Sequence, residues 1–385
     1  MKVHYVNSFA SGTQHKVFNG ATLYMFAELF PAEVHVYSVP SSECFLKTIP
    51  NAGNVASWKR LWVCSINSLA GLGLRYVQSA LCNVWVLLKA KPVDLVVYNF
   101  NNVFSSHVVD ILCRCFRRNV LVFCHNELEY ITNSGKHSSL QKKVLSRLTN
   151  SYFSVRRKQV AKGLRFVVLG GSILRNLRPV LSPEMAARFW AIDHPVTTSE
   201  KSVHHVETGK GYVNIGTVGI VNYYKGASEL VNVVKSVSPD SNVRFSIVGS
   251  VQGDVEPFRN AGITLPPNPS VPMPDGEFQR VVAALDFILL LYPHDTYRLM
   301  ASGAVLDALR FEKPIIALRT DYFEYLFKKF GKFGYLANDT GELLHLIEHA
   351  SELSRDFPFR SIAGQLSPQA LLPELKKITS SFNYK

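Results

Sequence analysis

The chain has 385 residues, of which 47% are hydrophobic and 18% are charged. This balance excludes an intrinsically disordered chain, and the length suits two domains better than one. The net charge of +13 belongs entirely to residues 1–200, where 23 Lys and Arg stand against 10 Asp and Glu. A basic charge on one half predicts a polyanionic partner: a nucleic acid, an anionic membrane surface or a diphosphate-bearing substrate.

All six cysteines lie in the first third of the chain, without a CxxC pair or nearby histidine pairs. This favours reduced thiols in the cytoplasm over disulfides or a zinc site. The first residues form a strand pattern and lack the features of a secretory signal peptide. Polar residues and Arg75 interrupt the apolar stretch at residues 61–88, which therefore predicts a buried or partly interfacial helix instead of a membrane span.

The first half alternates strand and helix patterns. We expect strands at residues 3–6, 34–39, 95–98, 120–124, 166–169 and 191–196, and helices at 18–30, 104–117 and 139–162, with a further helix starting at 173. The first strand leads into a loop of small residues. In a doubly wound sheet this loop faces the ligand crevice, so Ser11 and Gly12 are candidate acceptor-binding residues.

His125 and Glu127 directly follow the expected strand at 120–124. Ligands bind at the carboxyl ends of strands in an open α/β sheet. The two residues are therefore candidates for a general base or for binding an acceptor hydroxyl, with a solvated polar loop as the alternative. The expected helix at 139–162 is basic with an apolar side. A membrane-surface helix and a solvated outer helix both fit that pattern.

Residues 197–210 are polar and aperiodic, which predicts an interdomain linker. Beyond it we expect strands at residues 211–215, 243–248, 262–265, 287–291, 313–318 and 333–336, and helices at 227–236, 278–284, 340–351 and 370–380, with another opening at 302. The predicted fold is α/β, with two Rossmann-like doubly wound domains facing a cleft, at residues 1–196 and 211–360. Residues 361–385 should return as a helix to the first domain.

Two places in the second half suit a phosphate group. Lys225 and Gly226 stand immediately before a helix, where glycine permits close approach and lysine supplies a point charge. Ser302 and Gly303 open a helix after the strand at 287–291, so its first N–H groups and positive end can face an anion. Asp307 lies one turn further, within reach of ligand hydroxyls. An ordinary βα turn is the alternative reading of this second place.

The order and spacing of these motifs resemble the glycosyltransferases of the GT-B fold, close to family 4. The matching segments are GTVG at 216–219, the Lys225-Gly226 pair, FSIVG at 245–249, DFILLLYP at 286–293, ASGAVLDAL at 301–309 and KPIIAL at 313–318. The resemblance covers residues 211–340. The first half agrees in layout only, including the HNE at 125–127, the LGGSI at 169–173 and the AIDHP at 191–195.

The resemblance implies a role for each matching position. Lys225 would contact the donor diphosphate beside Gly219 and Gly226. The backbone N–H groups of Ser302 and Gly303 would bind the same diphosphate, and Asp307 would bind the donor ribose. The family usually carries two glutamates separated by seven residues here. Asp307 stands at the second of these positions and Leu299 at the first. The family's arginine before the lysine is also missing, and Arg298 is the candidate to replace its charge.

The resemblance therefore predicts a glycosyltransferase of the hexosyltransferase type that uses a nucleoside-diphosphate sugar as donor. Its acceptor would be a saccharide or a lipid-diphosphate-linked saccharide, used in assembling cell-surface polysaccharide. We expect no metal or other cofactor, because no Asp-x-Asp pair is present to hold a metal. Lys225, Arg298 and the helix start at Ser302 would stabilise the leaving diphosphate. If the reaction inverts the anomeric carbon, Glu127 or His125 would be the base.

The basic first half fits a cytoplasmic protein bound peripherally to the inner face of the plasma membrane, with an anionic membrane surface as partner. Two other functions stay open: a nucleotide-sugar epimerase of the same fold, and a catalytically inactive relative that serves as a binding scaffold. Nucleic-acid binding is not expected, because aromatic residues do not interleave with the basic run in any recognisable module.

Overall fold

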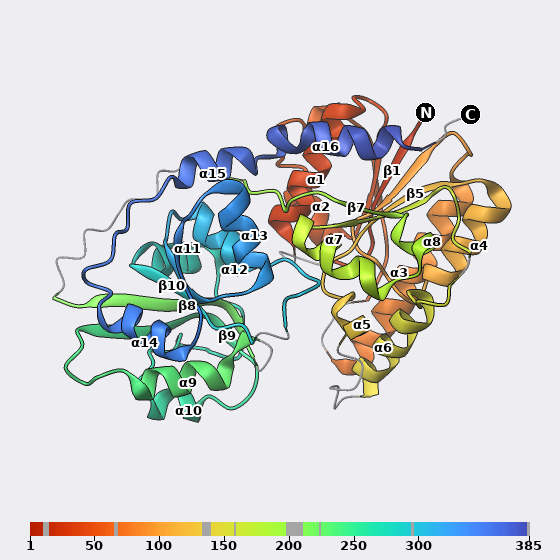
Figure 1. Cartoon of the computed structure of the whole chain (residues 1–385). Coiled ribbons are helices and arrows are strands. Elements are labelled where there is room, and N and C mark those ends of the chain that lie inside the picture. The colour runs from red at the N-terminus through yellow and green to blue at the C-terminus, as the bar shows by residue number, and fades with distance from the viewer. Residues whose placement is uncertain are drawn as a thin grey trace. The chain divides into compact units, whose positions relative to one another are not determined.

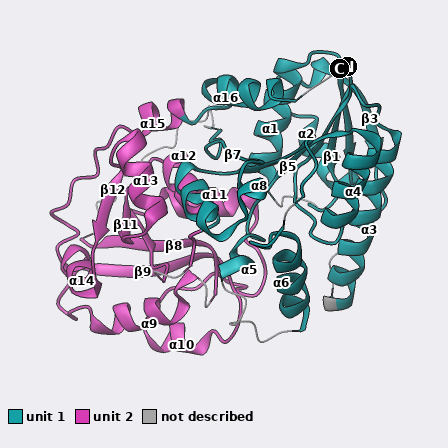
Figure 2. Cartoon of the chain, turned by 45° about the vertical axis from the view of Figure 1, so that its right-hand side comes forward, with its two compact units in different colours: residues 1–197, 299–301, 366–385 teal, residues 198–298, 302–365 magenta. Residues whose placement is uncertain are grey.

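A computed structural model describes residues 1–10, 15–64, 68–132, 140–157, 159–197, 211–222, 225–293 and 296–382 (Figure 1). The chain forms two compact units, coloured in Figure 2. Unit 1 comprises residues 1–197, 299–301 and 366–385, and unit 2 comprises residues 198–298 and 302–365. Ser11, Gly12 and all but the first residue of the expected linker at 197–210 lie outside the described residues.

Unit 1 is built on a parallel sheet of seven strands in the order β3-β2-β1-β4-β5-β6-β7. Its strands are β1 (Val3–Asn7), β2 (Val34–Ser38), β3 (Val55–Arg60), β4 (Leu95–Tyr98), β5 (Asn119–Phe123), β6 (Leu164–Val168) and β7 (Phe189–Ala191). Every residue of β1, β4 and β5 is buried. These central strands are mostly apolar because helices cover both faces of a parallel sheet, and the exceptions His4, Asn7 and Asn119 are buried polar residues.

The helices of unit 1 precede, separate and follow these strands. They are α1 (Lys16–Leu29), α2 (Pro40–Leu46), η1 (Ala52–Asn54), α3 (Leu69–Lys89), α4 (Ser106–Phe116), α5 (Glu129–Thr132), α6 (Leu140–Tyr152), α7 (Gly171–Leu177), η2 (Arg178–Val180), α8 (Pro183–Ala186) and α16 (Pro368–Ser380). None of the helices within the described part of the chain is long and apolar enough to cross a membrane.

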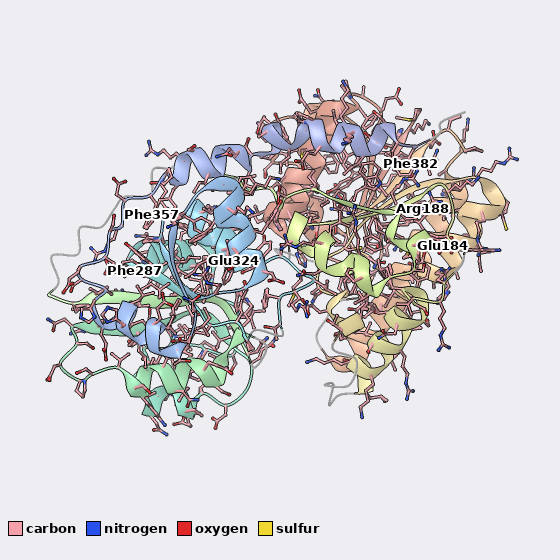
Figure 3. The ribbon with its side chains drawn as sticks, viewed as in Figure 1. Glu184, Arg188, Phe287, Glu324, Phe357 and Phe382 are labelled. Atoms are coloured by element: carbon pink, nitrogen blue, oxygen red, sulfur yellow. The ribbon has the colours of Figure 1, made fainter. Side chains whose placement is uncertain are left out.

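Helix α16 belongs to unit 1 although it follows unit 2 in the sequence. Ser367 caps its start by accepting the N–H of Ala370 at 3.2 Å. The helix packs along α1, and Leu371, Leu375 and Ile378 enter the core of unit 1. Phe382 lies just beyond the helix (Figure 3) and joins the same core, with the Arg165 guanidinium 5.1 Å from its ring centre.

Unit 2 has a parallel sheet of five strands in the order β12-β11-β10-β8-β9. Its strands are β8 (Val213–Val221), β9 (Val243–Val251), β10 (Phe287–Leu290), β11 (Ile315–Leu318) and β12 (Gly334–Ala337). Its helices are α9 (Ala227–Ser236), α10 (Glu256–Asn260), α11 (Asp275–Ala283), α12 (Gly303–Arg310), α13 (Asp321–Phe330), α14 (Thr340–Glu348) and α15 (Phe359–Gln365). The central strand β10 is buried at all four positions, as its apolar sequence predicts.

Two expected boundaries in unit 1 were wrong. Helix α6 ends at Tyr152 instead of reaching residue 162, because the chain beyond it binds to α4. Asp110 of α4 pairs with Arg157 and accepts the N–H of Ala161 at 2.7 Å. The last strand of unit 1 is β7 at 189–191 rather than at 191–196. It is held where the ring of Phe189 stacks on that of Phe166 at 4.9 Å.

Two expectations in unit 2 also need correction. The expected strand at 262–265 contributes only one bridge, between Thr264 and Ser246. Strand β8 extends to Val221 instead of ending before the GTVG segment, and pairs with β9 at every residue. Gly219 and Gly249 face each other in that pairing, and a Cβ atom on Gly249 would lie 2.1 Å from the Gly219 carbonyl oxygen. These glycines allow two strands to approach closely and do not form a turn.

Candidate functional site

The loop before α9 depends on a glycine. Gly226 has φ +75°, a left-handed conformation that favours glycine. A Cβ atom at this position would lie 1.9 Å from the carbonyl oxygen of Leu291, just after β10. Only glycine lets the start of α9 approach the end of the central strand this closely.

Gly226→Ala should therefore destabilise the protein by about 2–4 kcal/mol, because the added methyl group meets backbone and the φ angle is strained. Urea unfolding of the full chain measures the change. Gly276→Ala is the matched control. Gly276 lies in α11 without a positive φ, and a Cβ atom there meets nothing within 4 Å. Equal stability losses in both variants would contradict the close-approach argument.

The Lys225 ammonium lies at the carboxyl end of β8. A Cβ atom on Gly219 would be 3.5 Å from Lys225 Nζ, so the absence of a side chain at Gly219 leaves space in front of the ammonium. Burial lowers the pKa of Lys225, and Asp307 partly offsets that effect. No carboxylate among the described residues forms an ion pair with Lys225. A partly desolvated cation of this kind favours a bound anion.

The N-terminus of α12 is the second feature of this site. Ser302 is fully buried and caps the helix, with its Oγ atom 3.4 Å from the N–H of Val305 and 2.8 Å from the hydroxyl of Tyr292. Gly303 is exposed, and a Cβ atom there would meet nothing within 4 Å. The helix therefore presents its first N–H groups and the positive end of its dipole to open space.

Asp307 lies one turn into α12. Burial raises the pKa of its carboxyl group to about 6, although Arg310 and Lys225 act in the opposite direction. The site thus combines three features. Lys225 supplies a cation, Gly303 marks the open end of a helix, and Asp307 supplies a hydrogen-bond acceptor that ionises close to neutral pH. Such a site can bind a ligand that carries both phosphate and hydroxyl groups.

The raised pKa of Asp307 predicts a pH-dependent gain in stability for Asp307→Asn. Ionised Asp307 is less favourable in the folded than in the unfolded chain, so the wild type loses stability as the pH rises from about 4 to above 6. The uncharged amide should stabilise the protein by about 1–3 kcal/mol at pH 8 and much less at pH 4. Urea unfolding at both pH values tests this. A gain that is independent of pH would contradict it.

Arg298 is exposed and is the last residue of unit 2 before the chain enters unit 1 at residues 299–301. Leu299 is 1% exposed, and its N–H donates to Glu129 Oε1 at 2.6 Å. The leucine at this position is therefore a packing residue of unit 1. The hydrogen bond of Glu129 was not predicted, because nothing in the local sequence distinguishes Glu129 from a surface carboxylate.

In unit 1, His125 and Glu127 come together directly after β5. His125 Nε2 lies 2.8 Å from the carbonyl oxygen of Asn99, which can only accept, so Nε2 carries a proton. Burial, reinforced by His15, lowers the pKa of His125 well below 6.5. The imidazole is therefore neutral at pH 7.

Glu127 is 4% exposed, and its Oε2 atom accepts the backbone N–H of His125 at 2.9 Å. Oε1 is buried and has no hydrogen-bond partner among the described residues. Burial raises the pKa of Glu127 to about 7, against the lowering effect of nearby backbone N–H groups, among them that of His125. A carboxylate with a pKa near neutrality and one unpartnered oxygen has the properties of a general base.

Two further histidines lie beside His125. The ring of His15 is 4.6 Å from that of His125, and Phe18 contacts both His125 (4.7 Å) and His194 (5.2 Å). Neither His15 nor His194 was predicted to lie in the site. His194 lies within the AIDHP segment, shortly after β7 ends at Ala191. Its position close to the end of a strand is the one sequence feature that indicates a place near the site. In the described ranges, no cluster of His, Cys, Asp and Glu could hold a metal ion.

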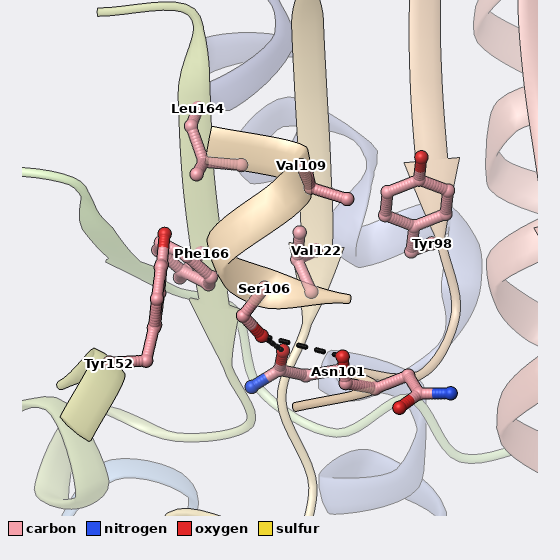
Figure 4. Close-up of a pocket in the computed structure, with 9 residues that line it drawn as sticks. Tyr98, Asn101, Ser106, Val109, Val122, Tyr152, Leu164 and Phe166 are labelled. Atoms are coloured by element: carbon pink, nitrogen blue, oxygen red, sulfur yellow. Dashed lines mark hydrogen bonds between the residues drawn. The ribbon is translucent and has the colours of Figure 1, made fainter. Parts of the chain in front are cut away.

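A small cavity lies between α4 and strands β4, β5 and β6 (Figure 4). Ser106 Oγ donates to Asn101 Oδ1 at 3.3 Å on its wall. The Asn101 amide nitrogen and the Tyr152 hydroxyl are buried without partners in the described part of the chain. The cavity measures about 10 Å³, which is the room one water molecule requires. A water molecule in the cavity can form hydrogen bonds with these two groups, but the cavity is too small for a sugar.

Two parallel α/β units of this kind define the GT-B fold, and solved structures confirm it. The Anabaena protein HepE, in complex with UDP and glucose, is 14% identical over 99% of this chain and 100% of its own, with a TM-score of 0.64. Sucrose-phosphate synthase from Thermosynechococcus elongatus is 13% identical over 99% and 98%, with a TM-score of 0.63. The catalytic domain of Arabidopsis thaliana starch synthase IV, bound to ADP and acarbose, is 11% identical over 99% of both chains, with a TM-score of 0.61.

The similarity is one of fold. No protein-family model matches the sequence, and no curated protein matches it either. The predicted α/β class and the resemblance to GT-B glycosyltransferases are confirmed at the level of architecture. The roles predicted for the individual residues stay predictions.

Proposed function

We propose that the protein is a glycosyltransferase that uses a nucleoside-diphosphate sugar as donor. The observation that carries this proposal is the placement of the Lys225 ammonium beside Gly219 at the end of β8, where no side chain of residue 219 stands in front of it. A diphosphate bound there balances the desolvated cation. The N-terminus of α12, which is open at Gly303 beyond the buried cap Ser302, supplies N–H groups for the same anion.

Unit 2 is the donor-binding unit in this proposal. Asp307 binds the ribose hydroxyls, and Arg298 adds positive charge for the leaving diphosphate. These cations and the helix dipole stabilise the charge that develops on the leaving group, so the reaction uses no metal. Support comes from the fold shared with HepE, whose structure holds UDP and glucose, and with starch synthase IV, whose structure holds ADP.

Unit 1 is the acceptor-binding unit. In an inverting reaction Glu127 takes the proton of the acceptor hydroxyl through its unpartnered Oε1, and His125 orients the same hydroxyl. The transferred unit is a hexose and the acceptor a saccharide carried on a lipid diphosphate, used in cell-surface polysaccharide assembly. The basic charge of residues 1–200 supports this acceptor and a peripheral place at the cytoplasmic face of the plasma membrane.

A thermal-shift screen of the full chain with UDP, GDP and ADP tests the donor site. A nucleotide present at about 100 times its dissociation constant should stabilise the folded chain by about 2.7 kcal/mol. We expect one nucleotide to act and Asp307→Ala to diminish its effect. Glu184→Gln, which changes an exposed carboxylate of unit 1 (Figure 3), is the control and should leave the shift unchanged.

Failure of all three nucleotides to shift the unfolding temperature would overturn the donor-site assignment. If a nucleotide binds, incubation with its sugar conjugates separates the remaining functions. Transfer to an added acceptor or hydrolysis of the donor supports the transferase. Conversion of one nucleotide sugar to its epimer, or binding without turnover, would instead identify an epimerase or a scaffold.

A further inference from the structure

One side of α3 in unit 1 is exposed and apolar. Its exposed large apolar residues are Leu74, Val77, Leu81, Trp85 and Leu88, each between 43% and 63% exposed. Steps of three or four residues place all five along one side of the helix. Single exposed apolar residues are ordinary on a protein surface, but a continuous stripe marks an interaction surface.

The neighbouring helix α4 extends this surface. The two helices contact each other and lie side by side in Figures 1 and 2. Val108, Ile111 and Phe116 of α4 are between 44% and 49% exposed. We call these three residues and the five of the α3 stripe the α3–α4 face.

The segment before α3 adds a tryptophan near this face. The backbone N–H of Cys64 donates to Gln78 Oε1 of α3 at 2.7 Å, which fixes the segment along the helix. Trp62, two residues earlier, is 81% exposed. Among the large apolar residues that the structure describes as exposed, Trp62 has the highest exposed fraction.

The exposed charges that residues 61–118 contribute to the α3–α4 face are all positive. Lys89, Lys91, Arg114 and Arg117 are exposed at the ends of the two helices and just beyond them. Residues 61–118 contain only two acidic residues, Asp94 and Asp110. Their exposed fractions are 4% and 0%, so neither presents a carboxylate to solvent. An apolar surface with exposed cations at its border suits a partner that is apolar in its interior and anionic at its boundary.

The basic helix α6 lies next to this region. His107 Nε2 of α4 is 3.0 Å from Ser151 Oγ of α6, and the rings of His107 and Tyr152 are in edge contact at 5.1 Å. Lys143 and Arg147 of α6 are exposed. They extend the basic border beyond α4.

Trp85 connects the apolar and basic parts. The Lys89 ammonium lies 3.6 Å from the centre of the Trp85 ring, and the ring meets Tyr37 of β2 edge-on at 6.0 Å. Tryptophan and lysine side chains suit the boundary between hydrocarbon and lipid headgroups, since each has an apolar body and a polar end.

We propose that the α3–α4 face docks onto an anionic lipid bilayer, with its apolar side chains in the headgroup boundary and its cations on lipid phosphates. A second copy of the chain fits less well, because a two-fold contact would gather the cations of both copies around one interface without supplying acidic partners from residues 61–118. This proposal names the surface that would bind the protein to the membrane in the peripheral location proposed above. It does not depend on the donor site in unit 2.

Flotation of the full chain with vesicles tests the proposal. We expect binding to vesicles of phosphatidylcholine with phosphatidylglycerol, and weak or no binding to phosphatidylcholine alone. Leu81→Glu should weaken binding at least about tenfold, because it puts a carboxylate into the apolar boundary. Lys89→Gln should weaken it about fivefold, the effect of one cation near an anionic surface, and added salt should reduce that difference.

Val271→Glu is the matched control. Val271 is 51% exposed in unit 2, so the substitution makes the same chemical change away from the α3–α4 face. It should leave vesicle binding unchanged. Because the positions are exposed, all three variants should keep the unfolding temperature of the wild type.

Three results would overturn the proposal. They are absence of wild-type binding to anionic vesicles, equal binding by Leu81→Glu and wild type, and a wild-type dimer that Leu81→Glu converts to a monomer. Nucleotide thermal shifts on the same preparations separate this proposal from the donor site. A variant that loses vesicle binding but keeps its nucleotide shift supports the membrane surface whether or not the protein transfers a sugar.

Discussion

Lys225→Met should lower the rate of sugar transfer by about 10²–10³, the usual cost of removing one group that stabilises charge in the transition state. Methionine keeps much of the length and the apolar body of the lysine, so the space beside Gly219 stays filled without an ammonium. Because burial already lowers the pKa of Lys225, the variant should fold at least as stably as the wild type. Steady-state kinetics with the donor identified by the nucleotide screen measures the loss.

Lys235→Met is the control for this variant. Lys235 lies in the last turn of α9, is exposed, and its replacement should leave the transfer rate unchanged. A Lys225→Met enzyme with the wild-type kcat and donor KM would remove the diphosphate role from this lysine. Loss of donor binding with kcat retained would place its effect on the ground state instead.

Glu127→Gln should lower transfer by about 10²–10⁴ if the carboxylate is the general base. Glutamine has nearly the same shape but cannot take a proton. Donor binding should persist, because the substitution lies in unit 1 and the donor residues lie in unit 2. Transfer assays and nucleotide thermal shifts on the same variant separate the two effects.

The pH dependence provides a second test of Glu127. A base acts in its deprotonated form, and burial raises the pKa of this group to about 7. The wild-type kcat/KM should therefore rise with pH through about 7 and level off above it. Glu184→Gln serves as the control and should keep both the rate and the profile. A Glu127→Gln enzyme with an unchanged rate would move Glu127 from catalysis to the support of the loop after β5.

Much of the architecture was predictable because buried parallel strands are apolar over their whole length. The run that forms β10 has no polar residue and β5 has only Asn119 at its start, so length and composition identify them, whereas β1 also carries His4 and Asn7. Strand β3 (Val55–Arg60) is the contrasting case. It lies at the edge of its sheet, and none of its residues is fully buried. Its sequence alternates small, apolar and basic residues and carries no such signal.

The candidate site was predictable where a functional residue directly follows a strand or directly precedes a helix. His125 and Glu127 could be found because they stand at the end of β5, and Lys225 and Ser302 because each precedes a helix. His15 and His194 could not be found in this way. His15 contacts the His125 ring directly, and His194 is connected to it through Phe18. Both are tertiary contacts between segments far apart in the sequence. The length of β8 was not predicted for a similar reason. The role of Gly219 as a strand residue is evident only from its pairing with Gly249 of β9.

The position of α16 has a consequence for how the protein is made. Unit 1 supplies the first strands to leave the ribosome, yet Leu371, Leu375 and Ile378 of its core are translated after all of unit 2. Until then, the surface of α1 that α16 covers is bare. Unit 2 is contained within residues 198–365, apart from residues 299–301, and can complete its core earlier. Nascent unit 1 should therefore be the stage of synthesis that depends most on chaperones, although its strands emerge first.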